Sequence, residues 1–213
     1  MFGQSRPAYG PLWETTPFYS PAVEELYPYD VDRAKQVLED AGWTEGSDGI
    51  REKDGQRLSV SMPSTDFSGP FDELAQGIWK DAGIELVLVP MDGAAADDAI
   101  NNSEVNLYDN SWVSSDPVVL NNLFLSKNID GGYAWSKWPS DELDQLLEEG
   151  QRTIDDERRT EIYAQVQQII MENALIVPLY GNPGASIAYE SNYQNVKQDF
   201  RNYLWLYDTS VSS

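Results

Sequence analysis

The sequence contains no cysteine and no histidine among its 213 residues. Without cysteine the chain cannot form a disulfide or supply a thiol nucleophile, and without both residues it lacks the usual ligands of zinc. Imidazole acid–base chemistry is excluded for the same reason. Aspartate and glutamate are therefore the only acid–base groups that the chain has in number. The compartment stays open, because a protein without cysteine fits either redox environment.

Positive charge is also scarce. Only 14 Lys and Arg stand against 36 Asp and Glu, which gives a formal net charge of −22. A phosphate backbone or an anionic membrane surface would be repelled, so we expect no nucleic-acid partner. The acidic residues are spread along the chain, which is typical of a solvated surface that stays soluble in concentrated salt. A salt-loving source is therefore a hypothesis.

Long hydrophobic runs are missing, since no apolar stretch approaches the roughly 20 residues of a membrane-spanning helix. The chain is nevertheless 41% hydrophobic, which is typical of a globular protein with a buried core. Its opening residues, Met1–Ser5, resemble neither a signal peptide nor a natural domain edge and could equally be a cut end. Asp97-Asp98 and Asp155-Asp156 lack the spacing and glycine of a calcium loop, so we predict no metal and no cofactor.

Helix boundaries are clear at two places in the first half of the chain. Asp30 is positioned to cap a helix that Gly42 ends in the left-handed conformation. Pro70 opens a second helix that ends at Gly83. Between the two helices, Asp54-Gly55 predicts a two-residue hairpin turn.

Strand signals flank the second helix. Leu58–Met62 alternates apolar and polar residues, and Ile84–Val89 is almost wholly apolar, as in a strand covered on both faces. A strand, a helix and a strand within about 33 residues have the size of a βαβ unit, so we predict two parallel strands. Ser140 and Asp155 are positioned to cap later helices. Leu175–Tyr180 is predicted to be an edge or bulged strand, because it contains a proline.

We take Val105–Leu125 as the stretch around which the chain is organised. Its first half is predicted to be a strand with Tyr108, Asn110 and Trp112 on one face. Polar groups and a large aromatic side chain at the carboxyl end of a strand suit the recognition of a small molecule. The alternative is a tryptophan that packs in the core without any ligand.

The exit from this strand, Ser114-Ser115-Asp116-Pro117, is a helix-start signal. Asp116 is positioned to cap the helix, and Pro117 to occupy its first position. Capping alone explains Asp116, so its part in a ligand site stays an alternative. A glycine-rich loop farther along carries Tyr133 and Trp135, which either reach a cleft or pack on each other at the surface.

Three groups of motifs together resemble a known family. They are Tyr29–Lys35 with Ala41-Gly42-Trp43; Trp112 with Asp116-Pro117; and Ser140–Leu147, Arg158–Tyr163, Gln168–Ile170 and Ile176–Tyr180. The first is similar to a YDPEKAK…AGY helix, the second to a W…DP segment, and the third to two closing helices and an IPLY strand. This order is typical of the extracellular solute-binding proteins of family 5, which bind peptides or nickel and feed ABC importers. The resemblance covers roughly residues 5–208.

The resemblance implies an α/β fold: one lobe, the carboxyl-terminal one, of a type II periplasmic-binding-protein fold, with a mixed sheet flanked by helices. We expect a single lobe over residues 1–213, with a lead-in at 1–28, a core at 29–208 and a tail at 209–213. The resemblance further implies a longer two-lobe protein, extracellular or periplasmic and anchored to a membrane. Its partners would be a small solute and the permease of an ABC importer, and it would be no enzyme.

One departure from the family pattern concerns the ligand. Peptide-binding members usually carry W-x-x-D-Y-x-D-P, whose first aspartate holds the free amino group of the peptide. The segment Trp112–Pro117 has no counterpart of that Asp-Tyr pair. Neutral hydroxyl and amide groups beside aromatic rings would suit an oligosaccharide as well as a peptide. The candidate ligand-binding residues are Trp112, Ser114, Ser115, Asp116, Asn110, Tyr133 and Trp135.

Two functions of other classes compete with solute binding. A glycoside hydrolase could use a pair of carboxylates, but no carboxylate here has an apolar setting in the sequence that would raise its pKa. An interaction module could use the exposed aromatic residues of the lead-in. Turnover of an oligosaccharide would favour the first alternative, and stable self-association the second.

Overall fold

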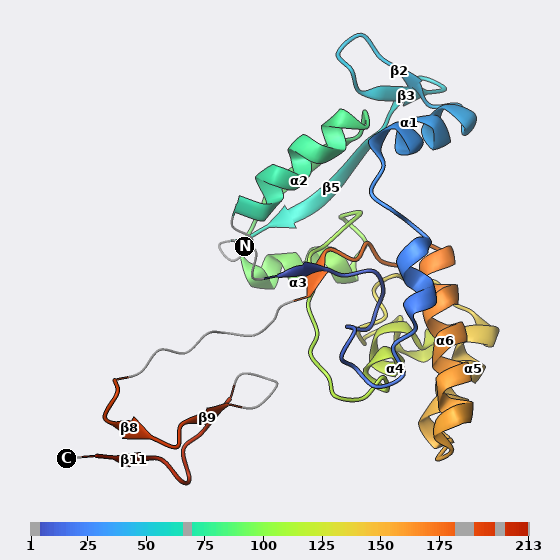
Figure 1. Cartoon of the computed structure of the whole chain (residues 1–213). Helices are drawn as coiled ribbons and strands as arrows, with labels where there is room; N and C mark the ends of the chain where they lie inside the picture. Colours follow the sequence, from blue (N-terminus) through green and yellow to red (C-terminus); the bar gives the residue numbers. More distant parts are fainter. Residues whose placement is uncertain (1–4, 66–69, 182–189, 199–202, 213) are drawn as a thin grey trace. The chain divides into compact units, whose positions relative to one another are not determined.

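The computed structural model describes residues 5–65, 70–181, 190–198 and 203–212. The chain forms two compact units. We call Pro28–Ser111 the α/β unit, and Met1–Tyr27 together with Trp112–Ser213 the helical unit. Each unit has its own secondary structure and is described separately (Figure 1).

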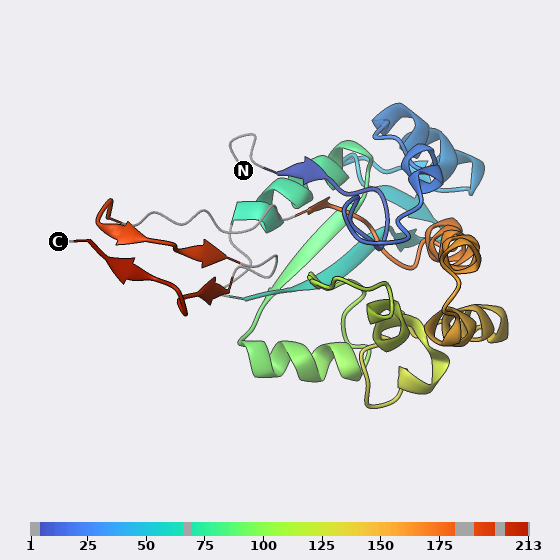
Figure 2. The same cartoon turned by 60° about the horizontal axis from the view of Figure 1, so that its bottom comes forward.

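The α/β unit is built around two parallel strands. Strand β5 pairs with β6 in a register that runs from Ser59 opposite Glu85 to Ser64 opposite Pro90. Helix α2 joins the two strands and lies beside them, which confirms the predicted βαβ unit (Figure 1, Figure 2). The elements are α1 (Val31–Asp40), β2 (Thr44–Glu45), β3 (Arg51–Lys53), β4 (Gln56–Arg57), β5 (Ser59–Ser64), α2 (Pro70–Asp81), β6 (Glu85–Pro90) and α3 (Gly93–Asn101).

The predicted ends of the first helix are confirmed. An Oδ of Asp30 accepts the backbone N–H of Arg33 at 2.8 Å, so this residue is the N-cap of α1. Gly42 has a φ of +87°, and the N–H of Trp43 donates to the carbonyl of Leu38 at 2.8 Å. This glycine-based stop depends on neighbouring residues alone, which is why the sequence could predict it.

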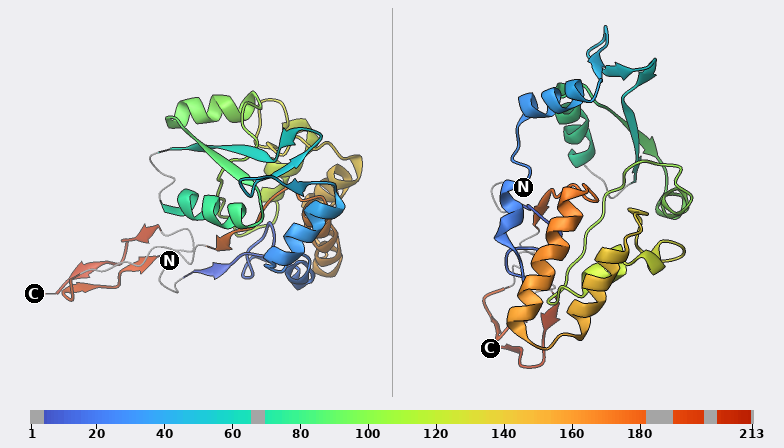
Figure 3. Two further views of the ribbon diagram at one scale, coloured as in Figure 1. Left: turned by 90° about the horizontal axis from the view of Figure 1, so that it is seen from above. Right: turned by 90° about the vertical axis from the view of Figure 1, so that its right-hand side faces the viewer.

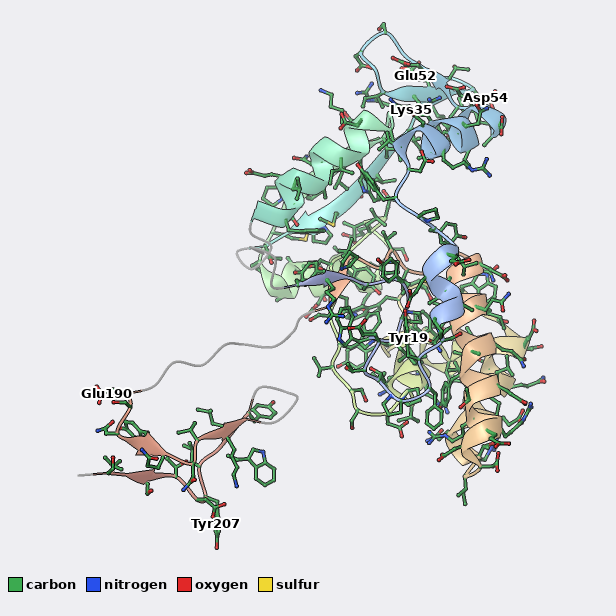
Figure 4. All side chains as sticks on the ribbon, viewed as in Figure 1. Tyr19, Lys35, Glu52, Asp54, Glu190 and Tyr207 are labelled. Carbon is green, nitrogen blue, oxygen red and sulfur yellow. The ribbon has the colours of Figure 1, made fainter. Side chains whose placement is uncertain are left out.

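The hairpin between β3 and β4 is also confirmed. Lys53 faces Gln56, and both turn residues have positive φ, 52° at Asp54 and 77° at Gly55. Figure 4 labels Asp54 at this turn.

Strand β6 is covered on one face only. Leu86 is buried, but Val87 is 40% exposed, so the expectation that both faces are covered is wrong.

The helical unit takes its core from α4 (Val119–Phe124), α5 (Asp141–Arg152) and α6 (Asp156–Glu172). Figure 3 shows α5 and α6 running side by side. Their inward residues and Leu12 of the lead-in form one buried cluster, and a fully buried Leu or Ile side chain contributes roughly 1.5–3 kcal/mol. The cluster consists of Leu12, Leu120, Phe124, Leu125, Leu143, Leu147, Ile162, Tyr163, Val166 and Ile170.

The lead-in is fastened to this unit at several points. Strand β1 (Arg6–Pro7) pairs antiparallel with β7 (Tyr180–Gly181), and the 3₁₀ helix η1 (Pro21–Glu25) packs on α6. The buried side chain of Gln167 donates to the carbonyl of Phe18 at 2.9 Å and accepts the N–H of Ser20 at 3.2 Å. A second 3₁₀ helix, η2 (Ser126–Asn128), follows α4.

The last described residues form a short arm of paired strands. Strand β8 (Tyr193–Gln194) pairs with β11 (Ser210–Val211), and β9 (Lys197–Gln198) pairs with β10 (Leu204–Trp205). The side chains of the arm are largely exposed. Tyr207 is 96% exposed, and Figure 4 shows it pointing away from the ribbon.

Two strand predictions are wrong. The segment 105–113 has no strand, because Asn106 uses its side chain as well as its backbone to bond one residue of β5. The Asn106 Oδ1 accepts the N–H of Ser61 at 2.8 Å, and the N–H groups of Asn106 and Leu107 both donate to the carbonyl of Ser61. In the predicted strand 175–180, Tyr180 pairs with Pro7 of β1, and the carbonyl of Leu179 accepts the N–H of Ala8 at 3.4 Å. The residues before them are not a strand, and Pro178 offers no N–H for a longer ladder.

Candidate ligand-binding site

Trp112 begins the segment that carries most of the predicted site. Its ring is half-buried, and the indole N–H donates to the carbonyl of Pro11 at 2.9 Å. This bond joins the segment to the lead-in across about 100 positions of sequence and fixes the orientation of the ring. The exposed part of the ring is therefore left for apolar or stacking contacts.

The two serines that follow differ in their availability. The hydroxyl of Ser114 donates to the carbonyl of Asp116 at 2.8 Å and accepts its N–H at 3.1 Å, so it is engaged within its own turn. Ser115 is exposed, and its hydroxyl has no hydrogen-bond partner in the described part of the chain. Of the two, Ser115 is the better candidate to contact a ligand.

Asp116 is held by protein partners on two sides. Its Oδ1 accepts the N–H of Val118 at 2.9 Å, and the carboxylate forms an ion pair with Arg159 of α6 at 3.2 Å. The guanidinium of Arg159 also lies 4.6 Å from the centre of the Phe18 ring. The carboxylate thus stabilises the turn before α4, but the predicted cap at Asp116 is wrong, because the N-cap of α4 is Val118 and no side chain caps the helix. Helix α4 itself begins at Val119, so the placement of Pro117 at its first position is wrong by two residues.

Tyr133 and Trp135 contact each other. Their ring centres lie 5.4 Å apart at an interplanar angle of 69°, an edge-to-face arrangement. The loop is tight, because a Cβ on Gly132 would come within 2.7 Å of the carbonyl of Asn128. Tyr133 is 62% exposed, so the pair packs on itself and still presents an aromatic surface.

Asn110 stands apart from the other six predicted residues. It is exposed and belongs to the α/β unit, whereas Trp112–Asp116, Tyr133 and Trp135 belong to the helical unit. Its predicted placement on a strand face with Tyr108 and Trp112 is wrong, because the described segment is not a strand.

Sequence reasoning missed an acidic pair in the α/β unit. Asp72, in the first turn of α2, is only 2% exposed, and neither of its carboxylate oxygens has a hydrogen-bond partner among the described residues. Burial raises the pKa of the Asp109 carboxyl, and the negative charge of Asp72 raises it further. The expectation that no carboxylate has a setting that raises its pKa is therefore wrong. The sequence pattern did not indicate that Asp72 is buried, because aspartate is common in the first turn of a helix.

The described residues contain no group of three or more potential metal-binding side chains, and none of their helices is long and apolar enough to cross a membrane.

Comparison with known sequences supplies the family. A sequence model of the bacterial extracellular solute-binding proteins, family 5 (middle region), matches residues 1–132. The chain belongs to this family. The predicted family is therefore confirmed.

Two relatives show how far the likeness of this family 5 member extends. It is 32% identical over 175 residues to Protein XP55 of Streptomyces lividans, which covers 79% of the chain. It is 28% identical over 180 residues to Di/tripeptide-binding protein 1 of Pseudomonas aeruginosa, which covers 82%. The chain spans about a third of the length of these curated relatives, 31% in both cases.

A solved structure shows the fold of the family 5 member. The oligopeptide-binding protein AppA of Bacillus subtilis, in complex with a nonapeptide, matches all of the chain and 44% of its own chain, with a TM-score of 0.77 and 23% identity. The predicted type II periplasmic-binding-protein fold is confirmed by this match. The strands of the described residues form small sheets of two or three strands.

Proposed function

We propose that the chain is the ligand-binding lobe of an extracellular substrate-binding protein that delivers a peptide to an ABC importer. Membership of family 5 carries this proposal. The family model matches 132 of the 213 residues, which is 62% of the chain. The relative that is 28% identical is named for di- and tripeptides. The assignment of residues 1–213 to a single lobe is also part of the proposal. In it the protein binds and releases its solute without chemical change.

The contacts of the helical unit support a binding role for two residues. Trp112 presents a ring whose orientation is fixed by the bond to Pro11, and Ser115 offers a hydroxyl that is not used within the fold. Asp116 acts as a positioning residue in this proposal, because Arg159 and the N–H of Val118 already occupy its carboxylate. Tyr133 and Trp135 provide a second aromatic surface.

An oligosaccharide is the second candidate solute. The exposed ring of Tyr133, held edge-on to Trp135, favours it, because flat sugar faces stack on aromatic rings and sugar hydroxyls pair with neutral groups such as Ser115. A peptide is preferred because a relative is named for that class of solute.

Native mass spectrometry of the protein purified from the cells that make it tests the proposal. We expect a bound adduct whose mass and fragmentation identify a peptide. An adduct made of hexose units would replace the peptide with the oligosaccharide. Protein that stays free of adduct, even after dialysis against di- and tripeptides, would contradict the proposed function. Release of reducing sugar from an oligosaccharide would contradict binding without chemistry.

The role of Trp112 has its own test. Trp112→Phe removes the bond to Pro11 and shrinks the ring, so we expect at least about tenfold weaker solute binding. Trp205→Phe is the matched control, because this tryptophan lies exposed on the terminal arm. Equal affinities of the two variants in isothermal titration calorimetry would remove Trp112 from the site.

The location and partner of the protein are part of the same proposal. We place it outside the cell or in the periplasm, anchored to the membrane in its full length, with the permease of an ABC importer as its partner. Fractionation of the source cells, with and without detergent, tests the anchor. Recovery of the protein in the cytosolic fraction would contradict the proposed location.

A further inference from the structure

One sequence motif lies outside the residues assigned to solute binding. Asn101-Asn102-Ser103 has the form Asn-x-Ser with a middle residue other than proline, which is the acceptor pattern for N-linked glycans. Of the twelve asparagines in the sequence, only Asn101 begins this pattern. Because such a tripeptide often arises by chance, its place in the fold has to show whether a glycosyltransferase can use it.

Asn101 is the last residue of α3, the helix labelled in Figure 1, and lies on its outward face. The buried residues of α3 are Ala96 and Ala99. Asn101 follows Ala99 by two positions, which is about 200° around the helix axis. Asp97, one turn before Asn101, is exposed on the same side. A group attached to Asn101 therefore extends away from the core of the α/β unit and displaces no buried side chain of the helix.

The helix ends within the motif itself. The N–H of Glu104 donates to the carbonyl of Ala99 at 2.8 Å, and Ser103 before it has a φ of +58°. The chain thus turns out of the helix directly after the acceptor, and Asn102 and Ser103 are exposed as well. Helix ends fray at low free-energy cost, so an exposed turn of this kind can open into the active site of an enzyme.

The left-handed position of this turn carries a serine. Helices α1 and α2 end with the same backbone bonds and place Gly42 and Gly83 there, because this conformation disfavours a Cβ. Ala174 accepts the same conformation after α6, so the backbone alone does not mark a site. What Ser103 adds is a hydroxyl two residues after an exposed asparagine, which the acceptor pattern requires.

We propose that Asn101 is a site of N-linked glycosylation. The inference rests on the proposed location outside the cell, where acceptor patterns of this kind are modified. The donor is an oligosaccharide whose anomeric carbon is bound to a lipid-borne phosphate. The Asn101 Nδ2 forms a bond to that carbon while the bond from the carbon to the phosphate oxygen breaks. The phosphate leaves with the electron pair and takes up the proton that Nδ2 loses, so the transfer needs no oxidant or reductant.

Mass spectrometry of the protein purified from the cells that make it tests the site. Proteolysis after Asp98 and Glu104 releases residues 99–104, in which Asn101 and Asn102 are the only asparagines. We expect this peptide to carry a mass increment made of sugar units, which electron-transfer fragmentation places on Asn101. The increment is covalent and survives denaturation, which distinguishes it from a bound oligosaccharide. Exported protein that yields only the unmodified peptide would overturn the proposal.

Three variants made in the same cells separate the acceptor pattern from the fold. Asn101→Gln and Ser103→Gly are both expected to lose the increment completely. Glycine suits the left-handed backbone at position 103, so an unchanged circular dichroism spectrum of Ser103→Gly is expected and assigns the loss to the hydroxyl. Asn102→Gln preserves Asn-x-Ser and should keep the increment. An increment that persists in Asn101→Gln, or one that is lost in Asn102→Gln, would contradict the site.

The same preparations separate this inference from the proposed function. Exported protein that holds a peptide adduct while residues 99–104 are unmodified would refute the glycosylation and leave solute binding intact. Protein that is glycosylated at Asn101 but binds no peptide would confirm the modification and contradict the proposed function. Unmodified protein recovered in the cytosolic fraction would contradict both.

Discussion

Asp116 stabilises the fold at the scale of single residues. Its carboxylate accepts the N–H of Val118 and pairs with Arg159, whose guanidinium lies over the ring of Phe18. The local bond spans two positions and lies in the turn before α4, whereas the helix-start pattern had predicted Asp116 as the cap of the helix. The ion pair spans 43 positions and depends on how α6 packs beside the start of α4, which no local pattern contains.

Arg51 is the residue whose loss we expect to harm the α/β unit most. It is buried, and its guanidinium donates to the carbonyls of Ala82 and Trp43 and to the carboxylate of Glu39, at 3.1, 2.8 and 2.9 Å. Arg51→Met leaves two backbone carbonyls without this donor, so we expect the free energy of unfolding to fall by about 3 kcal/mol in urea denaturation.

Arg57→Met is the matched control for this change. Arg57 pairs with Asp48 and Glu85 at the surface, where an ion pair contributes about 0–1 kcal/mol. If the free energy of unfolding falls no further in Arg51→Met than in Arg57→Met, the prediction is wrong. Water would then take over the hydrogen bonds that the buried guanidinium donates.

Asp109 makes stability depend on pH. Its pKa is raised in the folded protein by burial and by the charge of Asp72, so the folded state binds the proton more tightly than the unfolded chain. Ionised Asp109 therefore destabilises the fold above its folded pKa, and the destabilisation is relieved as the pH falls through that pKa. Asp109→Asn should melt at a higher temperature than the native chain at pH 7. The difference should vanish below about pH 4, where an unfolded aspartate is also protonated.

Calorimetry over this pH range checks the prediction. Asp97→Asn removes the same charge from an exposed position on α3 and controls for net charge. A gain in melting temperature at pH 7 that is equal in both variants would contradict the local cause.

At the scale of elements, α2 shows how a helix end is tied to the packing around it. Gly83 follows the helix with a φ of +86°, and the N–H of Ile84 donates to the carbonyl of Trp79 at 3.0 Å. A Cβ on Gly83 would come within 2.7 Å of Arg51. Position 83 thus favours glycine for two reasons: its backbone has a positive φ, and the side chain of Arg51 fills the space that a Cβ would need.

The contrast with Gly77 of the same helix gives a prediction. Gly83→Ala should lower the free energy of unfolding by about 1–2 kcal/mol, because the left-handed conformation disfavours a Cβ. Gly77→Ala should raise it by about 0.5–1 kcal/mol, because a Cβ there meets nothing within 4 Å and alanine favours the helix. Opposite signs in urea denaturation would confirm the assignment, and a stabilised Gly83→Ala would contradict it.

The predicted strand at 105–113 failed for a physical reason at this same scale. Alternation of side chains is necessary for a strand, but a strand also needs a partner for its ladder of backbone bonds. Ser61 offers a bond at one position, where the side chain of Asn106 takes the N–H that a longer ladder would need. The segment stays irregular.

For the whole molecule, the net charge of −22 predicts a dependence on salt. Self-repulsion among exposed carboxylates weakens the fold in dilute buffer, and added ions screen it over about 10 Å at 0.1 M. The melting temperature should therefore rise with potassium chloride at pH 7. The rise should shrink near pH 4, where carboxylates begin to be protonated. A melting temperature that is independent of salt at pH 7 would contradict a salt-adapted surface.

The sequence by itself determined the local features and the family. The caps at Asp30 and Gly42, the turn at Asp54-Gly55 and the βαβ unit depend on neighbouring residues or on repeating patterns, and all are found in the structure. The family motifs depend on order along the chain, which needs no coordinates. Burial and distant pairing depend on which elements come together, and only the tertiary structure decided them. It decided that Arg159 neutralises Asp116, and that Asp72 lies buried with no hydrogen-bond partner among the described residues.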